Sequence, residues 1–310
     1  MSYRVGVDIG GTFTDMVVLD EKTGEISIAK SPTTPRAPIE GVLNAVRKLE
    51  IDLREVAYFV HGTTAATNAV VQRRGAKVGL ITTQGFRDIL EIMRCHREFH
   101  YDLQWVKPKP LVPRRLRVEV PERIDYKGRV IRPLDEGAAR DAVRRLRAHG
   151  VEAIAVCFIF SFVNPAHERR MKEILKGEWP EVYVSTSSEI LPEVREYERT
   201  STVVIDAYVK PLINHYLSSL ERGLGEMGFR SDLMIMTSGG GVVTSAAAKE
   251  IPVYTLSSGP AGGVIGSVYL GRAVKEKNLI SMDMGGTSFD VSLVDGGRPR
   301  HTTEGEIEWG

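Results

Sequence analysis

The sequence predicts an α/β protein with two related halves, and two observations lead to this prediction. Strand-like segments alternate with helix-like segments along most of the 310 residues, which is typical of α/β layers around a mostly parallel sheet. A strand–Gly-Gly–strand signature also occurs twice, once toward each end of the chain. At this length two domains are the default expectation. We place them at residues 1–190 and 191–310.

The first part of the chain reads as a three-stranded meander followed by alternating helices and strands. Apolar alternation and turn residues predict the meander strands at 4–9, 14–20 and 26–30. A proline-rich connector follows them. The next predicted elements are a helix at 39–49, a strand at 57–61, a helix at 63–73, a strand at 77–82 and a helix at 86–94.

The segment 108–133 differs, because it is rich in proline and alternates arginine with apolar residues. We predict an antiparallel insertion there with one solvated face. Beyond it the α/β pattern resumes, and Pro211 predicts a kink or break in the longest helix. The later predicted elements are a helix at 137–149, a strand at 153–160, a helix at 165–175, a strand at 181–185, a helix at 195–226, a strand at 233–237 and a helix at 259–275.

Composition and charge narrow the class of protein. Apolar residues make up 42% of the chain and charged residues 26%, the profile of a soluble globular protein. The formal net charge is +1, so we expect no nucleic-acid partner and no membrane partner. The two cysteines predict neither a disulfide framework nor a metal cluster. Without an apolar signal or spanning segment, a cytoplasmic location is expected.

The repeated signature is the main functional observation. Its copies run from Val7 to Asp20 and from Met282 to Asp295, align without a gap 275 residues apart (283 − 8), and share six identical positions. A Gly-Gly turn can present bare backbone N–H groups to an anion, because glycine has no Cβ. An aspartate just before the glycines can hold a hydrated Mg²⁺ ion. Two such turns predict a nucleotide held between two related domains, although either copy alone fits a structural Gly-Gly turn.

Candidate ligands for the phosphate groups follow from these turns. In the first copy they are Gly10, Gly11, Thr12 and Thr14, beside the metal-binding candidate Asp8. A glycine-rich segment lies shortly before the second copy and opens a helix, whose free N–H groups favour an anion. The candidates in that segment are Gly259, Gly262 and Gly263. Close packing of helix against sheet also requires glycine and remains the alternative there.

Taken together, these segments resemble the actin, sugar-kinase and heat-shock-chaperone ATPase superfamily, and within it the hydantoinase A / 5-oxoprolinase / acetone carboxylase β family. The resemblance covers essentially the entire chain. Its motifs are VDIGGTFTD at 7–15, HGTTAATNAV at 61–70, GFRD at 85–88, EYER at 196–199, DAYVKP at 206–211, SGPAGGV at 258–264 and DMGGTSFDV at 283–291.

The resemblance implies an actin/hexokinase-like (ribonuclease H-like) nucleotide-binding architecture. Because family members are more than twice this long, we expect the first domain to be complete and the second domain to be truncated. In the second turn, Phe289 stands where the family usually has threonine, so a side-chain contact from that position is in doubt. The remaining phosphate-binding candidates of the second turn are Gly285, Gly286, Thr287 and Ser288.

The activity implied by the resemblance is ATP-dependent hydrolysis of a cyclic amide, of the hydantoin or 5-oxoproline type, through a phosphorylated intermediate. ATP and Mg²⁺ (or Mn²⁺) are the implied cofactors. Asp8 and Asp283 would bind the metal ion directly or through water. Asp15 and Asp290 would orient a nucleophile or stabilise their own turns. Two alternatives stay open, namely the ATP-handling subunit of an acetone/acetophenone carboxylase-type enzyme and a nucleotide-binding module without turnover.

The resemblance also implies a substrate site and a partner. It places the His61-Gly62-Thr63-Thr64 segment near the cleft, which makes His61, Thr63 and Thr64 candidates for substrate binding. A strand–turn–helix junction capped by threonine is the alternative for this segment. The implied partner is a hydantoinase B-like subunit, either separate or fused, and we expect an oligomer.

Overall fold

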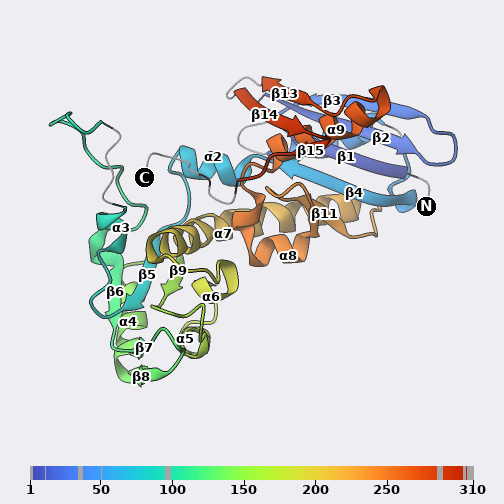
Figure 1. Cartoon of the computed structure of the whole chain (residues 1–310). Coiled ribbons are helices and arrows are strands. Elements are labelled where there is room, and N and C mark those ends of the chain that lie inside the picture. Colours follow the sequence, from blue (N-terminus) through green and yellow to red (C-terminus); the bar gives the residue numbers. More distant parts are fainter. Residues whose placement is uncertain are drawn as a thin grey trace. The chain divides into compact units, whose positions relative to one another are not determined.

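The computed structural model describes residues 3–10, 12–33, 38–49, 51–94, 99–284, 289–302 and 305. By their contacts, the residues group into two compact units (Figure 1). Unit 1 consists of residues 1–68 and 213–305, and unit 2 consists of residues 69–212 and 306–310. The chain therefore leaves unit 1 and later returns to it. The sequence predicted two domains that each consist of one continuous segment, with the boundary between residues 190 and 191. That boundary stays a prediction.

A six-stranded mixed sheet forms the centre of unit 1. Its strands are β1 (Tyr3–Ile9), β2 (Phe13–Asp20), β3 (Ile26–Pro32), β4 (Val56–Thr63), β11 (Leu233–Met236) and β12 (Val242–Thr244). Their order across the sheet is β12-β11-β4-β1-β2-β3. The first three strands pair antiparallel, which confirms the predicted meander, whereas β4 is parallel to β1 and β11 is parallel to β4.

Helices and a second small sheet complete unit 1. The helices assigned wholly to it are α1 (Pro38–Lys48), α8 (Ser245–Glu250) and α9 (Ser258–Val274), and α2 (Ala65–Val71) begins in it. The second sheet contains β13 (Leu279–Met284), β14 (Phe289–Asp295) and β15 (Arg298–Pro299). Helix α1 packs on one face of the large sheet, where Val5, Val7, Met16 and Val18 are buried. Alternate residues of β1 and β2 therefore project from the opposite face.

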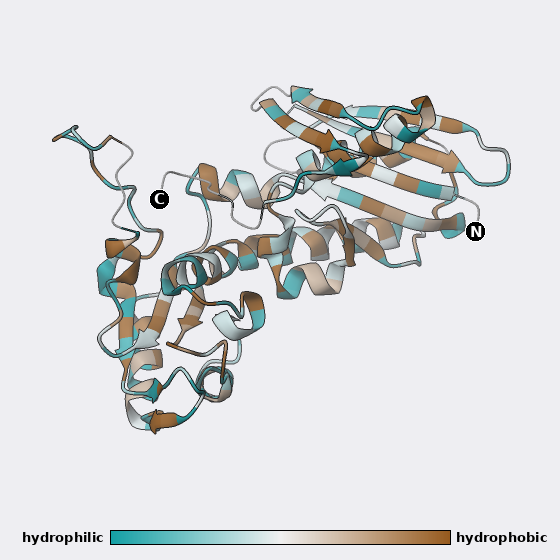
Figure 2. Cartoon of the chain, in the orientation of Figure 1, coloured by the Kyte–Doolittle hydropathy of each residue, from teal (hydrophilic) through white to brown (hydrophobic). Residues whose placement is uncertain are grey.

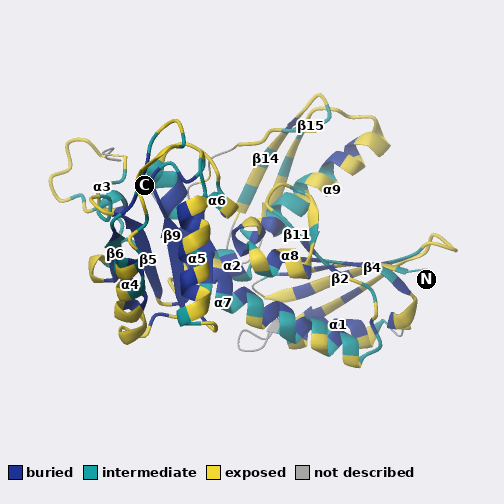
Figure 3. Cartoon of the chain, turned by 90° about the horizontal axis from the view of Figure 1, so that it is seen from below, coloured by how far each residue is buried: buried dark blue, intermediate teal, exposed yellow. Residues whose placement is uncertain are grey.

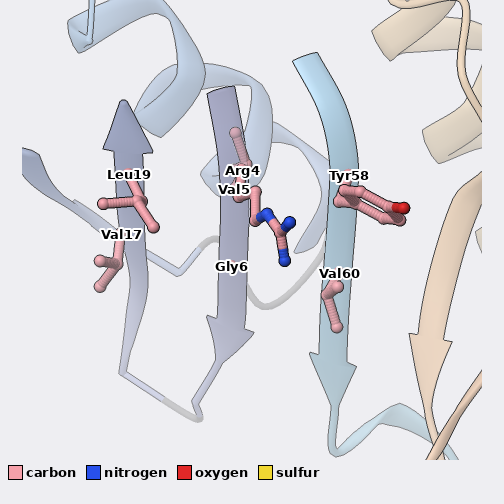
Figure 4. Close-up of a pocket in the computed structure, with 7 residues that line it drawn as sticks. All are labelled: Arg4, Val5, Gly6, Val17, Leu19, Tyr58 and Val60. Carbon is pink, nitrogen blue, oxygen red and sulfur yellow. The ribbon is translucent and has the colours of Figure 1, made fainter. Parts of the chain in front are cut away.

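Part of that opposite face is a shallow apolar groove of about 360 Å³. Figure 4 shows the residues that line it, which come from β2, β1 and β4 and include Val17, Val5 and Tyr58. Asp8 projects from the same face but lies near the C-terminal end of β1, whereas Arg4 lies near its N-terminal end. The groove and the strand end that carries Asp8 are thus separate places on one face.

Unit 2 is built around a four-stranded parallel sheet with the order β10-β9-β5-β6. Its strands are β5 (Val78–Thr83), β6 (Arg117–Val120), β9 (Ala153–Cys157) and β10 (Tyr183–Thr186). Every residue of β5 and β9 is buried (Figure 3), as expected for central strands covered on both faces. Their apolar character is visible in Figure 2. Helices α3 (Ile89–Ile92), α4 (Glu136–Ala148), α5 (Ala166–Glu178) and α6 (Ser187–Ile190) belong to this unit.

The predicted antiparallel insertion at 108–133 is wrong for β6, which joins the parallel sheet beside β5. Arg117 has only 2% of its surface exposed. Its guanidinium donates to the Val112 carbonyl and to the Glu91 carboxylate, both at 2.9 Å. These acceptors compensate the buried charge, so an arginine-alternating strand is tolerated in the interior. The short hairpin of β7 (Arg123–Ile124) and β8 (Val130–Arg132) is antiparallel, as predicted.

Helix α7 (Glu196–Glu226) runs through Pro211 without a break. The division between the two compact units falls just after this proline, between Leu212 and Ile213. Within the described part of the chain, no helix combines the length and the apolar character needed to cross a membrane.

Candidate functional site

The two copies of the signature pair in the same way in the structure. In the first copy Asp8 of β1 lies opposite Asp15 of β2. In the second copy Asp283 of β13 lies opposite Asp290 of β14. The sequence repeat is therefore also a repeat of strand register. Gly11 of the first turn and residues 285–288 of the second turn lie outside the described residues. Residues 285–288 are the four phosphate-binding residues predicted in the second turn.

The described part of the first turn is held by the end of β3. Thr33 donates from its hydroxyl to the Gly10 carbonyl at 3.0 Å and from its backbone N–H to the Thr12 carbonyl at 2.9 Å. Thr12 is exposed, as a phosphate ligand must be, whereas Thr14 is fully buried. The Thr14 hydroxyl lies 3.4 Å from the Thr33 hydroxyl, and a Cβ on Gly41 of α1 would approach it to 2.6 Å. Thr14 is thus a packing residue beneath the turn.

Glycines surround the Asp8 carboxylate. A Cβ built on Gly62 would lie 3.2 Å from Asp8 Oδ1, and one built on Gly259 would lie 3.4 Å from the same atom. Gly62, one residue before the end of β4, lies beside Asp8 in the parallel register, and Gly259 is in the first turn of α9. The backbone therefore approaches the carboxylate closely from two sides, which only glycine permits without narrowing the site.

Gly263 has the equivalent position beside the second aspartate, since its Cβ would lie 3.8 Å from Asp283 Oδ2. Gly262 differs, because its Cβ would meet Met236 Sδ of β11 at 2.9 Å. Two of the three predicted glycines of α9 thus face the signature carboxylates, and the third serves close packing of helix on sheet.

Electrostatics link the two signatures. Burial raises the pKa of Asp8 above its usual value, and the negative charges of Asp283 and then Asp15 raise it further. Asp15 also forms an ion pair with Lys30 of β3 at 3.0 Å. Two carboxylates that repel each other beside a solvent-exposed turn form a set of oxygen donors that a divalent cation would stabilise.

The donor set fits Mg²⁺ better than a transition metal. Among the described residues, no group of three or more His, Cys, Asp or Glu side chains is arranged to hold a metal ion. Mg²⁺ is usually held by one or two carboxylates together with waters and substrate phosphates, not by a complete protein cage. Asp8 and Asp283 are the residues that would hold it here.

The three predicted substrate-binding residues lie at the end of β4 and behave differently from one another. His61 is fully buried, and its Nε2 lies 2.6 Å from the Tyr216 hydroxyl of α7. Thr63 is also buried, and its hydroxyl accepts from the Ala65 N–H at 3.2 Å. Thr64 is half-buried and donates to the Ile9 carbonyl of the first signature at 3.3 Å. Of the three, Thr64 is best placed to meet a ligand at the Asp8 turn.

The burial of His61 predicts a pH-dependent stability of unit 1. Burial lowers the pKa of His61 to about 4, against the opposing effect of the Val7 carbonyl. An unfolded chain binds a proton near pH 6.5 and the folded one does not, so stability is lost as the pH falls from 6.5 toward 4. We expect the free energy of unfolding to be about 2 kcal/mol lower at pH 5 than at neutral pH because of this histidine. Native-state hydrogen exchange of β1 and β4 peptides, corrected for intrinsic rates, measures the change.

The variant His61→Asn should lose this part of the pH dependence. Any loss of stability from the missing hydrogen bond should be the same at each pH. The variant His215→Asn is the control, since His215 is exposed on α7 beside Tyr216. An equal pH dependence in wild type and His61→Asn would contradict the assignment.

Several residues that build the site have no role that the sequence predicts. They are Lys30, Gly62, Thr67, Tyr216 and Ser258. Ser258 contacts Thr63 across 195 residues of sequence. No local sequence pattern predicts such a contact, although Gly62 and Ser258 lie in two of the motifs that carry the family resemblance.

Two family models match the chain. The model described as the hydantoinase/oxoprolinase N-terminal region matches residues 4–179, and the model described as hydantoinase/oxoprolinase matches residues 199–309. An uncharacterised protein of Methanocaldococcus jannaschii is 41% identical over 310 residues, which cover 99% of this chain and 46% of that protein. The caprolactamase subunit alpha of Pseudomonas jessenii is 34% identical over 315 residues, which cover 98% of this chain and 45% of that subunit.

Solved structures agree with these matches. The ATP-dependent caprolactamase from Pseudomonas jessenii superposes with a TM-score of 0.83 at 35% identity, covering 94% of this chain and 43% of that one. The nucleotide-free structure of acetone carboxylase, described with ATP-dependent acetone carboxylation, superposes with a TM-score of 0.84 at 33% identity, covering 96% and 44%. The chain thus spans less than half the length of these relatives.

The structural matches confirm the predicted α/β, actin-like architecture. The matched relatives thus include an ATP-dependent caprolactamase and an enzyme of ATP-dependent acetone carboxylation. Since the first family model alone covers more than half of the sequence, the chain belongs to the hydantoinase/oxoprolinase family.

Proposed function

We propose that this chain is the ATP-handling part of an enzyme that opens a cyclic amide by hydrolysis through a phosphorylated intermediate. The observation that supports it most is the pair of repeated turns whose aspartates, Asp8 and Asp283, interact electrostatically beside the glycines of α9. Membership of the hydantoinase/oxoprolinase family and similarity to an ATP-dependent caprolactamase support the same chemistry.

An unstrained amide is a poor electrophile, and phosphorylation of its oxygen converts that oxygen into part of a leaving group. In the proposed reaction the amide oxygen attacks the γ-phosphorus of ATP, and the bond from that phosphorus to the ADP oxygen breaks. One water molecule adds to the activated carbon so that the C–N bond can break with protonation of the nitrogen. A second water molecule hydrolyses the resulting acyl phosphate. The products are an open-chain amino or N-carbamoyl acid, ADP and phosphate.

The protein contributes positioning and charge neutralisation to this reaction. Asp8 and Asp283 would hold Mg²⁺, which would neutralise charge on the phosphate oxygens when bound. Thr12, Thr287, Ser288 and the glycine amides of the two turns hold phosphate oxygens. Asp15 is already paired with Lys30, which favours a role in shaping its turn over one in orienting the nucleophile.

A second candidate is the ATP-handling subunit of a ketone carboxylase, and the superposition on acetone carboxylase favours it. The same loops would then phosphorylate an enolate or bicarbonate. In either case we propose a cytoplasmic enzyme that acts with a hydantoinase B-like subunit or fused domain.

A substrate panel separates the two candidates. We expect 5-oxoproline, hydantoin or a related lactam to increase ADP release and to yield a ring-opened product by mass spectrometry, with the chain assayed alone and with a hydantoinase B-like subunit. ADP release that depends on acetone plus bicarbonate, with a carboxylated product, would favour the carboxylase instead. ATP binding without ADP release in either assay would favour a nucleotide-binding module without turnover, and a separate binding measurement that detects no ATP binding would contradict both candidates.

A further inference from the structure

One face of α9 lies along both signature aspartates. Gly259 and Gly263 are four residues apart, so they lie on the same helix face, about 6 Å apart along the axis. Gly259 faces the Asp8 carboxylate and Gly263 faces the Asp283 carboxylate. Two positions one helical turn apart thus each lie beside one of the signature carboxylates.

The same face continues toward β13. Ser267 follows Gly263 by four residues, and its hydroxyl lies 2.9 Å from the Ser281 hydroxyl of β13 while donating to the Gly263 carbonyl at 2.9 Å. Ser281 and Asp283 are two residues apart on one strand, so they project from the same side of it. The Ser267–Ser281 contact therefore fixes α9 against the face of β13 that carries Asp283.

The beginning of α9 is fixed to the other signature in a similar way. Ser258 is fully buried, and its hydroxyl donates to the Thr63 carbonyl at 3.1 Å and accepts from the Thr63 N–H at 3.4 Å. The Ser257 N–H donates to the Thr67 hydroxyl at 2.9 Å. Because Gly62 directly precedes Thr63, these contacts hold Gly62 and Gly259 together around Asp8.

We propose that α9 is a spacer that sets the distance between Asp8 and Asp283, with Ser258 and Ser267 as its positioning residues. Ser258 fixes the helix to the β4 end beside Asp8, and Ser267 fixes it to β13 beside Asp283. The two carboxylates are then held at a separation suited to one divalent cation and the phosphates it binds. This inference rests on the proposed function, because it assigns a purpose to the metal-binding pair.

The test compares Mn²⁺ binding, followed by the loss of the free-ion electron paramagnetic resonance signal, in variants of α9. Loss of a residue that orients metal ligands typically weakens metal binding about 10- to 100-fold. We expect Ser267→Ala to weaken Mn²⁺ binding by at least about tenfold. Ser267→Thr, which keeps the hydroxyl, should restore it. Ser258→Ala should have a similar effect, with some loss of stability from the unsatisfied Thr63 groups.

Glycine substitutions separate spacing from folding. Gly263→Ala and Gly266→Ala both raise helix propensity, and a Cβ at Gly266 would meet nothing within 4 Å. Of these two glycines, Gly263 alone faces a carboxylate, because its Cβ would contact Asp283 Oδ2 at 3.8 Å. We therefore expect Gly263→Ala but not Gly266→Ala to weaken Mn²⁺ binding, with both variants at least as thermally stable as wild type. Wild-type affinity in both Ser267→Ala and Gly263→Ala would overturn the spacer while leaving the proposed function intact. No Mn²⁺ binding by wild type would instead overturn the metal site on which both rest.

Discussion

Asp8→Asn is expected to reduce ATP turnover by about 100-fold or more while leaving the folded chain as stable as wild type or more so. A bound metal ion contributes several kcal/mol of charge stabilisation in such reactions, and each 1.36 kcal/mol is a tenfold change in rate. The stability expectation follows from the raised pKa of Asp8. A raised pKa means that the folded state disfavours the carboxylate, so removing its charge relieves that cost at neutral pH.

ADP release under saturating ATP and Mg²⁺ measures the first effect, and the melting temperature without metal measures the second. Asp295→Asn is the matched control, because Asp295 is the last aspartate of the second signature and lies exposed at the far end of β14. Turnover within about threefold of wild type in Asp8→Asn, a difference of less than 1 kcal/mol, would show that this carboxylate does not hold the metal ion.

The largest expected stability effect is at Glu168→Ala in unit 2. Glu168 is fully buried at the start of α5 and accepts three hydrogen bonds, from the Phe158 N–H at 2.8 Å, the Ser187 hydroxyl at 2.6 Å and the Ser188 N–H at 2.8 Å. Alanine would leave these donors without their acceptor in or near the interior. Since an unsatisfied buried group costs about 1–3 kcal/mol, we expect a loss of about 3 kcal/mol or more.

Urea unfolding followed by the fluorescence of Trp179, which lies just after α5, measures this loss. Glu173→Ala on the same helix is the control, because Glu173 is exposed and forms an ion pair with the exposed Arg170 at 2.7 Å. An exposed pair of this kind contributes about 0–1 kcal/mol. Similar unfolding midpoints for the two variants would contradict a structural role for Glu168.

The sequence could predict local elements where the apolar period was clear. The meander and the helix over α7 follow from local patterns, and the alternation of strands with helices predicted the parallel sheet found in unit 2. Segment 108–133 shows where this fails. Its alternating arginines indicated a solvated strand, but the buried Arg117 guanidinium donates to the buried Val112 carbonyl and to the exposed Glu91 carboxylate. Burial of a charge depends on acceptors supplied by the fold, which alternation cannot reveal.

The candidate site divides in the same way. Repetition of the D-x-G-G-T pattern identified Asp8 and Asp283 as related positions, and the matching strand registers confirm that relation. The sequence treated Thr12 and Thr14 as equivalent, yet the structure exposes the first and buries the second. Thr12 lies in the turn before β2, whereas Thr14 lies within β2 and faces Gly41 of α1. Only the packing of that helix on the sheet separates the surroundings of the two hydroxyls.

By itself the sequence determined the family, the architecture and the pair of aspartate turns, because these depend on residue identities at short, fixed spacing. Only the tertiary structure decided how those turns are held in relation to each other. Ser258 reaches Thr63 across 195 residues, and Gly259 and Gly263 face carboxylates at opposite ends of the chain. Such contacts arise when distant segments pack together, and their partners are chosen by the folded geometry and not by any local pattern.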